Sequence, residues 1–310
     1  MEAILTRNLS KVYKGLGKRT VHSLTGLNLT VQENEIFGFL GRNGAGKTTT
    51  IKLLCSLLKP VAGDGYVFGE SIRERATRRL VGYLPEQPYF YEYLTPQETL
   101  DFYGRLRGLG ASERNREWDK LSEMLDLRTI GQDRIKDFSK GMRQRVGFAV
   151  ALVGDPPVLI LDEPMSGLDP LGRRMVRELI VYQRGQKKTI FFSSHVLSDV
   201  EQICSRVGIL VKGRLTQQGR IDELLGGKMP QVEVVAVGLS REHAVSLSAK
   251  AEHHRYLEER DVFLFPDEET ANTAVKAIHA AAARLVEFNP VQETLEDYFM
   301  REQEQGERVS

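Results

Sequence analysis

A glycine-rich segment near the beginning of the sequence places the strongest constraint on the fold. The letters GRNGAGKTTT, residues 41–50, follow the apolar run Ile36–Leu40 and lead into TTIKLLCSLL, whose apolar spacing is helical. A strand, a glycine-rich turn and a helix in this order form the setting in which backbone N–H groups surround phosphate oxygens, beside the positive end of the helix. The segment therefore predicts a phosphate-binding loop.

Each residue type in this loop has a physical task. The glycines let consecutive N–H groups turn inward, Lys47 is placed to neutralise the β- and γ-phosphates of a nucleotide, and the Thr48 hydroxyl suits Mg²⁺. The alternative, a glycine turn with a solvated lysine, is disfavoured by the flanking strand and helix. The predicted nucleotide contacts are Gly41, Asn43, Gly44, Ala45, Gly46, Lys47, Thr48 and Thr49.

Two acidic residues and a histidine follow later apolar strands. Asp162 and Glu163 end the run VLILDEP, and His195 ends TIFFSSH. Because ligands of parallel sheets collect at the carboxyl ends of the strands, we expect these side chains to lie near the loop. Asp162 is then the candidate Mg²⁺ ligand, Glu163 the residue that polarises the attacking water, and His195 a donor to the γ-phosphate. Together with Lys47, Glu163 and His195 are the predicted catalytic residues.

Alternating strand and helix patterns indicate an α/β fold with a mainly parallel sheet. Val158–Leu161 and Thr189–Phe192 are continuous apolar runs, typical of strands buried on both faces, and helical segments separate them. Thr95 and Glu98 predict a helix start with a capping box. From there the apolar spacing is helical to about Leu127.

A glycine and proline linker around residues 226–230 divides the chain into regions 1–225 and 226–310. The second region predicts a small α+β domain. On a helix, the adjacent His253 and His254 would point about 100° apart, without partners at metal-ligand spacing, so we predict a solvated face rather than a metal site. The predicted strands are Val232–Val237, Val262–Phe265 and Leu285–Phe288, and the predicted helices are Arg241–Leu257, Glu268–Ala283 and Thr294–Glu302.

Charge and hydropathy exclude several function classes. The formal net charge of +1 gives no global field to attract nucleic acid. No apolar stretch approaches the roughly 20 residues of a membrane helix, and the N-terminal letters lack a secretory signal, so we expect a cytoplasmic protein. Cys55 and Cys204 have no CxxC partner and are predicted to be reduced core residues.

Five motifs together resemble a known family. GRNGAGKTT, FSKGMRQR, ILDEP, SGLD and SSH occur in the order of the Walker A, signature, Walker B, D-loop and H-loop segments of an ABC-type ATPase. The resemblance implies a P-loop NTPase domain with an antiparallel β subdomain and a helical subdomain, and ATP and Mg²⁺ as cofactors. It also implies a head-to-tail homodimer that powers a separate integral membrane permease from the cytoplasmic face of the cell membrane.

The signature segment, residues 138–145, adds detail to this resemblance. Its letters FSKGM replace the commoner LSGGQ, a variant associated with bacterial exporter ATPases that pair with ABC-2-type permeases, and NPVQETLEDYF is similar to their C-terminal extension. Ser139 can cap a helix, and Gly141 lets a phosphate approach the backbone. In the family this segment faces the nucleotide of the other protomer, so Ser139, Gly141 and Met142 are assigned to that contact.

Two further sites are assigned by the resemblance. Tyr13 matches the aromatic residue that stacks on adenine, although a core tyrosine is the alternative. Glu86 stands where the Q-loop glutamine is usual and is followed by Gln87, so the residue that senses Mg²⁺ is open between them; a carboxylate at Glu86 can itself hold the metal.

Three classes of function compete. The preferred one is ATP hydrolysis coupled to transport, with export as the expected direction. A ribosome- or DNA-directed ABC ATPase would show two ATPase units or long heptad coiled coils, and the sequence has neither. A non-hydrolytic scaffold is disfavoured by Glu163 and His195. The cargo cannot be inferred, and Tyr89, Phe90, Tyr91 and Tyr93 fit either a core or a partner surface.

Overall fold

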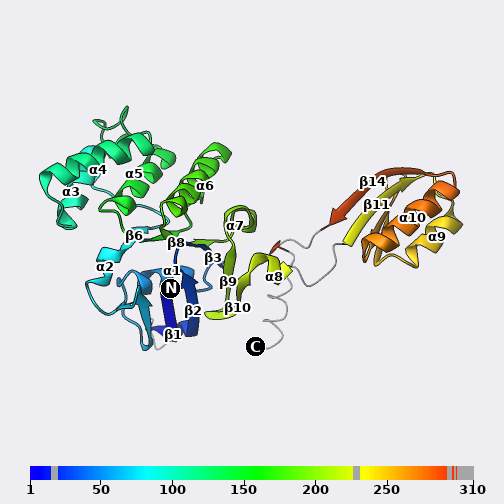
Figure 1. Cartoon of the computed structure of the whole chain (residues 1–310), viewed down its shortest axis with the longest axis horizontal. Helices are drawn as coiled ribbons and strands as arrows, with labels where there is room; N and C mark the ends of the chain where they lie inside the picture. Colours follow the sequence, from blue (N-terminus) through cyan, green and yellow to red (C-terminus); the bar gives the residue numbers. More distant parts are fainter. Residues whose placement is uncertain (15–19, 226–230, 292–294, 297, 299–310) are drawn as a thin grey trace. The chain divides into compact units, whose positions relative to one another are not determined.

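The computed structural model describes residues 1–14, 20–225, 231–291, 295, 296 and 298. The chain divides into two compact units, of which the first comprises Met1–Arg220 and the second begins at Ile221 (Figure 1). None of the helices built from the described residues is both long and apolar enough to cross a membrane.

A six-stranded sheet forms the centre of the first unit. Its strands are β3 (Ile36–Leu40), β6 (Val81–Leu84), β7 (Val158–Asp162), β8 (Thr189–Ser194), β9 (Arg206–Val211) and β10 (Arg214–Arg220). Their order is β10-β9-β3-β8-β7-β6, and every pair is parallel except β9 with β10. The predicted mainly parallel sheet is therefore confirmed, and β3, β7 and β8 are almost wholly buried, as their continuous apolar letters require.

An antiparallel sheet of order β2-β1-β4-β5 packs beside the central sheet and shares its core. Its strands are β1 (Glu2–Lys14), β2 (Thr20–Gln32), β4 (Ala62–Val67) and β5 (Glu70–Ser71). The helices of the first unit are α1 (Lys47–Leu54), α2 (Thr77–Leu80), α3 (Pro96–Leu106), α4 (Ala111–Met124), α5 (Lys140–Leu152), α6 (Pro170–Gly185) and α7 (Leu197–Ile203), with a 3₁₀ turn, η2, at Ile135–Asp137.

The helical subdomain consists of α3, α4 and α5, which pack against one another (Figure 1). The predicted capping box is present: Thr95 Oγ1 accepts from the backbone N–H of Glu98, and the Glu98 carboxylate accepts from that of Thr95. The helical spacing that extends to residue 127 is split into two helices, because Gly108 adopts a φ of 81° between them. A residue with a side chain rarely adopts such a backbone conformation.

The second unit has the order β11 (Gln231–Val237), α9 (Arg241–Ser248), β12 (His253–Leu257), β13 (Arg260–Phe265), α10 (Glu268–Ala280) and β14 (Arg284–Val291), preceded by α8 (Ile221–Leu225). Its sheet has the order β12-β13-β11-β14, and all pairs are antiparallel. This βαββαβ arrangement is the ferredoxin-like topology. A core of Val, Phe and Ala side chains lies between one face of the sheet and the two helices α9 and α10.

One predicted helix of the second unit is wrong in its second half. Helix α9 ends at Ser248, and residues 253–257 form the edge strand β12 instead of continuing the helix to Leu257. The strand turns back through Glu258 and Glu259, whose φ angles of 47° and 64° are those of a tight hairpin. Glycine and asparagine are the residues that predict such a turn, so this pair of glutamates gave no signal. The predicted helix Thr294–Glu302 lies largely outside the described residues.

The strand also changes the interpretation of the two histidines. His254 stacks on Phe263 with ring centroids 4.4 Å apart, and its Nε2 lies 2.8 Å from the carboxylate of the buried Asp261. His254 is therefore a packed, hydrogen-bonded residue rather than part of a solvated helix face. His253 is exposed. No group of histidine, cysteine and acidic side chains among the described residues is arranged to hold a metal ion.

Candidate active site

The glycine-rich loop connects β3 to α1 and is shaped by close backbone contacts. Gly46 precedes α1 with a φ of 111°, and a Cβ placed on it would lie 2.5 Å from the carbonyl oxygen of Ser23. Gly44 also has a positive φ, and a Cβ there would meet nothing within 4 Å of the described chain. The loop is therefore supported from one side at Gly46 and open at Gly44. This is the shape of a backbone cradle with room for an anion.

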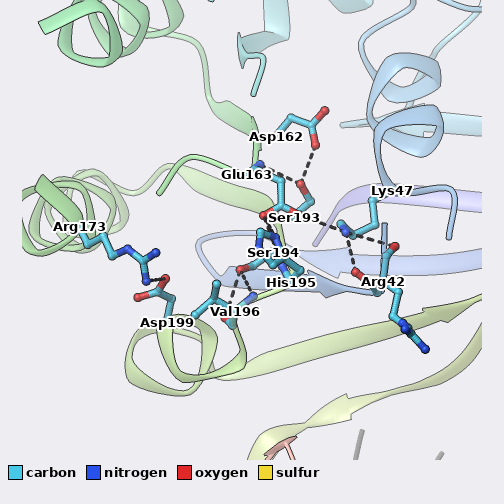
Figure 2. Close-up of polar contacts among 11 residues, drawn as sticks. Arg42, Lys47, Asp162, Glu163, Arg173, Ser193, Ser194, His195, Val196 and Asp199 are labelled. Carbon is cyan, nitrogen blue, oxygen red and sulfur yellow. Dashed lines mark hydrogen bonds and ion pairs between the residues drawn. The ribbon is translucent and has the colours of Figure 1, made fainter. Parts of the chain in front are cut away.

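Lys47 is buried, and its ammonium group is directed into the loop. Its Nζ donates to the carbonyl oxygen of Gly41 at 2.5 Å and lies 3.5 Å from that of Arg42 (Figure 2). The third neighbour is a carboxylate oxygen of Glu163, 3.1 Å away. A buried ammonium needs such partners, because an unpaired buried charge is costly. Lys47 therefore places a positive charge between the loop and the end of β7.

Asp162 and Glu163 lie at the carboxyl end of β7, beside β8. Both are buried, and Glu163 has a φ of 49°, a strained conformation for a residue with a side chain. Ser193 joins the two: its Oγ donates to Asp162 Oδ1 at 2.7 Å and accepts from the backbone N–H of Glu163 at 3.0 Å. The neighbouring strand thus fixes the orientation of both acidic residues.

His195 completes this cluster from the end of β8. Its Nδ1 lies 2.7 Å from Glu163 Oε2, and its backbone N–H donates to the same oxygen at 3.3 Å (Figure 2). The other oxygen, Glu163 Oε1, faces Lys47 but accepts no hydrogen bond from a described residue. This oxygen is paired with the Lys47 ammonium, but because a carboxylate oxygen has two acceptor sites, it keeps one for the proton of a bound water.

Comparisons with known proteins identify the family of the chain. A sequence family described as ABC transporter matches residues 24–166. An uncharacterised ABC transporter ATP-binding protein of Synechocystis sp. is 43% identical over 301 residues, which cover 96% of this chain and 83% of that protein. The chain belongs to the ABC transporter ATP-binding proteins. The family predicted from the five ordered motifs is confirmed, and the chain is an ATP-hydrolysing subunit of a transporter.

Two further likenesses define the family more closely. The bacitracin transport ATP-binding protein BcrA of Bacillus licheniformis is 40% identical over 224 residues, which cover 71% of this chain and 71% of that protein. The solved structure of an ATP binding subunit of an ABC transporter superposes with a TM-score of 0.65 at 32% identity, covering 72% of this chain and 91% of the other. The predicted ABC ATPase fold is therefore confirmed.

The signature segment of this ABC subunit lies at the beginning of α5. Ser139 caps the helix by accepting from the backbone N–H of Met142 at 3.3 Å. A Cβ on Gly141 would meet no heavy atom within 4 Å, and Ser139 is exposed. The described contacts of Ser139 and Met142 do not include Lys47 or the loop. The structure therefore brings Lys47, Asp162, Glu163 and His195 together, but not the signature residues.

The signature helix is nevertheless tied to the carboxylate strand. Gln144, buried on α5, donates from Nε2 to the carbonyl oxygen of Pro164 at 2.7 Å. The Lys140 side chain covers Gly167, where an added Cβ would collide with its ammonium group. A movement of α5 would therefore also shift the residues that follow Glu163, through these two contacts.

Tyr13, the predicted adenine contact, lies at the end of β1 beside α1. Its hydroxyl is 3.5 Å from Thr49 Oγ1, and the Thr49 oxygen also accepts from Ser23 Oγ at 2.8 Å. The ring is 39% exposed and has the Lys11 ammonium over it at 5.5 Å. Tyr13 is therefore not a core residue, and its ring borders the loop.

The metal candidates differ in position. Thr48 is exposed at the first turn of α1, and Asp162 is buried with one oxygen held by Ser193. A hydroxyl and a carboxylate form an all-oxygen donor set, which Mg²⁺ prefers. Glu86 and Gln87 are both exposed in the segment after β6, and among the described residues neither hydrogen-bonds to Thr48 or Asp162. The residues present thus fit a Mg²⁺ site at Thr48 and Asp162.

Sequence reasoning missed Ser193 and Asp199. The signal for Ser193 was its place two residues before His195, which puts it level with Asp162 in the parallel register of β7 and β8. Asp199 on α7 is buried and accepts from Arg177 of α6 at 2.8 Å, with Arg173 at 3.9 Å from its second oxygen. This pair connects the helix after SGLD to the helix after His195, and no sequence motif indicated it.

Proposed function

We propose that the chain works as a head-to-tail homodimer that binds ATP and Mg²⁺ between its protomers. The open N-terminal end of α5 carries this proposal. Ser139 and Gly141 stand at a helix start, where the first backbone N–H groups have no carbonyl partner within the helix and suit an anion, yet they have no described contact with the Lys47 cluster. A second protomer that places its α5 over the first protomer's loop would complete two equivalent sites.

The residues would share the chemistry as follows. Lys47 and the loop N–H groups hold the β- and γ-phosphates, and Thr48 and Asp162 hold Mg²⁺, which supplies further charge neutralisation. Glu163 accepts the hydrogen bond of the attacking water through Oε1, and His195 fixes the other oxygen of that carboxylate. Tyr13 stacks on the adenine. Glu86 or Gln87 adds a ligand when the segment after β6 approaches.

The partner would be a separate integral membrane permease, of the ABC-2 type, working in export. The likeness to a bacitracin transport protein and the FSKGM signature support this type. Beside the Glu86 segment lies a groove of about 910 Å³. Its apolar lining includes Leu57, Tyr83, Tyr89, Phe90, Tyr103 and Leu106.

The groove is suited to a short helix of the permease's cytoplasmic face. Tyr89 is 86% exposed and Leu106 is 68% exposed, which is unusual for large apolar side chains lining one hollow. Arg78 and Arg79 at its margin can pair with carboxylates of the incoming helix. A permease helix bound there would hold the chain at the cytoplasmic face of the membrane, and the net charge of +1 offers no attraction to nucleic acid.

Mixing two inactive variants tests the dimer. Lys47→Ala damages the loop and Ser139→Arg damages the signature, so a trans heterodimer contains one doubly damaged site and one intact site. ATP-dependent dimerisation, measured by light scattering, is expected to recover in the mixture relative to either variant alone. A mixture that performs no better than the separate proteins, while circular dichroism shows both to be folded, would refute the trans arrangement.

Affinity purification from membranes tests the partner. The wild-type chain should retain an integral membrane protein with several apolar spans. Leu106→Glu should lose it, because a buried carboxylate would enter the groove. Val61→Glu is the matched control, since Val61 is 63% exposed and does not line the groove. Equal capture by both variants would show that this groove is not the permease contact.

A further inference from the structure

Within the part of the second unit that the structure describes, no helix or further strand packs on one face of the sheet. Helices α9 and α10 pack on the face that carries Val232, Val234 and Phe263. The alternate residues of the same strands point to the opposite face. That opposite face contains a hollow of about 480 Å³, whose described lining consists of strand and hairpin residues. We call it the open face.

The centre of the open face is apolar. Val235 of β11 is paired with Val262 of β13, and Leu264 lies two residues further along β13. All three line the hollow: Val235 is 5% exposed, Val262 and Leu264 are half-buried, and Leu257 at the margin is 54% exposed. A soluble domain of this size gains by covering such a surface, since apolar side chains on an uncovered sheet favour association.

The charges at the margins are separated by sign across the sheet. Arg255 and Arg260 lie on the side of β12 and β13, whereas Glu233 and Glu287 lie on the side of β11 and β14. Glu258 in the hairpin is one exception, and Arg284 of β14, which the register pairs with Val237 of the same face, is another. Among the described residues, neither Arg255 nor Arg260 forms an ion pair.

One row of residues shows this polarity most clearly. The strand register aligns Arg255 with Val262, Val262 with Val235, and Val235 with Glu287. The row thus runs from a cation through two valines to an anion. Its ends are three strand spacings apart, about 14 Å, so the two charges cannot pair within one chain.

We infer that the open face packs against the open face of a second copy of this chain. A twofold axis in the plane between the two sheets, parallel to the strands, reverses the strand order of the second copy and keeps each row level. Arg255 of one copy then faces Glu287 of the other, twice, while the two valine pairs meet at the centre. Stacked sheets lie about 10 Å apart, a distance that an arginine and a glutamate side chain together can span. The row is therefore complementary to itself.

The area limits what this contact can do alone. Strand β11 has 7 residues, about 24 Å in length, and four strands span roughly 15–19 Å, so each copy offers about 400 Å². Stable dimers bury about 800 Å² from each partner. The open face would therefore strengthen a dimer that is held elsewhere. This role rests on the ATP-bound homodimer proposed above, which brings two second units to a high effective concentration.

Charge reversal in the full-length chain tests the pairing. In a Glu163→Gln background with ATP, Arg255→Glu and Glu287→Arg should each weaken dimerisation about tenfold in sedimentation velocity, because each creates two like-charge contacts. The double variant exchanges the charges and should restore the parental affinity. Arg241→Glu, on the helix side of the same unit, is the control for net charge. Reversals that behave like this control, in a background that does dimerise with ATP, overturn the inference and leave the ATP-bound dimer intact.

Cross-linking provides a readout that does not depend on affinity. Leu264→Cys places a thiol on the open face, and Lys276→Cys places one on the exposed side of α10. A short bifunctional thiol reagent should join two chains through residue 264 and not through residue 276, with the wild-type chain as the reagent control for Cys55 and Cys204. If the parent protein fails to dimerise with ATP, the proposed ATP-bound dimer is wrong, and cross-linking through residue 264 then decides the face pairing by itself. The absence of a cross-linked dimer at residue 264 refutes the pairing.

Discussion

The N-terminal ends of α1 and α5 are both helix starts suited to phosphate, but their surroundings in the protomer differ. At α1 the backbone is crowded: a Cβ added to Gly46 would lie 2.5 Å from the Ser23 carbonyl oxygen, and the Lys47 ammonium is enclosed by carbonyl and carboxylate oxygens. At α5 there is more room, since a Cβ added to Gly141 would meet no described atom within 4 Å outside its own stretch of helix backbone, and Ser139 is exposed. Both helix starts can bind phosphate, but the start of α1 is enclosed by residues of the same protomer, whereas the start of α5 lies at the protomer surface.

This difference indicates a division of labour. The α1 end is completed by residues of its own chain, including Glu163, the carboxylate proposed to polarise the attacking water. The α5 end adds a second positive helix terminus that becomes useful when another molecule supplies the phosphate. A γ-phosphate enclosed from both sides is also shielded from water, which strengthens every charge interaction at the reacting atom.

The largest expected effect comes from a variant that removes the proposed catalytic carboxylate at the α1 end and does not change the α5 end. Glu163→Gln removes the acceptor for the water proton but keeps the shape of the side chain. We expect turnover to fall by roughly 10²–10⁴, the usual contribution of a general base, while MgATP binding is retained. Phosphate release and equilibrium nucleotide binding measure the two quantities.

The control for this prediction is the dimer itself. The variant should still associate with ATP, because the α5 end and the phosphate loop are intact. Wild-type phosphate release by a pure sample would show that Glu163 is not the catalytic carboxylate.

A pair of glycine substitutions compares the two ends directly. Gly46→Ala must adopt a φ of 111° and place a Cβ 2.5 Å from a backbone oxygen, so we expect a loss of about 2–4 kcal/mol in the free energy of unfolding. Gly141→Ala meets no atom of its own chain and lies in a helix, so its stability should be unchanged or up to about 1 kcal/mol higher. Urea unfolding measures both.

The ATP-dependent dimerisation of the Gly141→Ala variant tests whether the α5 end contacts a second protomer. If the α5 end is a surface for a second protomer, ATP-dependent dimerisation weakens although the folded monomer is no less stable. A Gly141→Ala chain that dimerises and hydrolyses ATP normally would show that close backbone approach at α5 is unnecessary.

The sequence predicted the α1 end well because its signals are local. The spacing of glycines, the strand letters before them and the helix letters after them lie within about twenty residues, and the capping box at Thr95 is equally local. The acidic residues and His195 were placed correctly at one sheet edge because parallel strands share an edge.

The features that the sequence did not predict depend on contacts between segments that are distant along the chain. Ser193 holds Asp162 and Glu163 through a register that no local pattern encodes. Strand β12 reads as helix, but pairing with β13 outweighs that local preference, and its glutamate turn carries no hairpin letters. The openness of α5 is likewise a property of what does not pack there, and this is invisible in a list of letters.

A smaller effect is expected at Ser193, the residue that positions the acidic pair at the α1 end. Ser193→Ala leaves the backbone N–H of Glu163 and one Asp162 oxygen without a partner in a buried place, which costs about 1–3 kcal/mol of stability. Turnover should fall about tenfold through misorientation of Glu163, with the affinity for ATP less affected. Ser193→Thr, which keeps the hydroxyl, should recover more of kcat than of stability. A fall in stability without any change in kcat would mean that Ser193 is purely structural.

The smallest effect concerns the helical subdomain that carries the open end. The Arg114 guanidinium, helped by that of Arg105, lowers the pKa of Asp101 and connects α4 to α3 through a 2.5 Å contact. A carboxyl whose folded pKa lies below its unfolded value stabilises the protein above the unfolded pKa, and this contribution is lost as the pH falls through the folded pKa. Asp101→Asn should therefore be less stable than the wild type at pH 7, by less than about 1 kcal/mol because the ion pair is partly exposed. The difference should shrink towards pH 3.

Asp64→Asn, which breaks an ion pair with Arg73 that is exposed on both sides, is the matched control and should change stability less. If the Asp101 variant also lost nucleotide binding, the helical subdomain would be part of the α1 end rather than a separate support for α5.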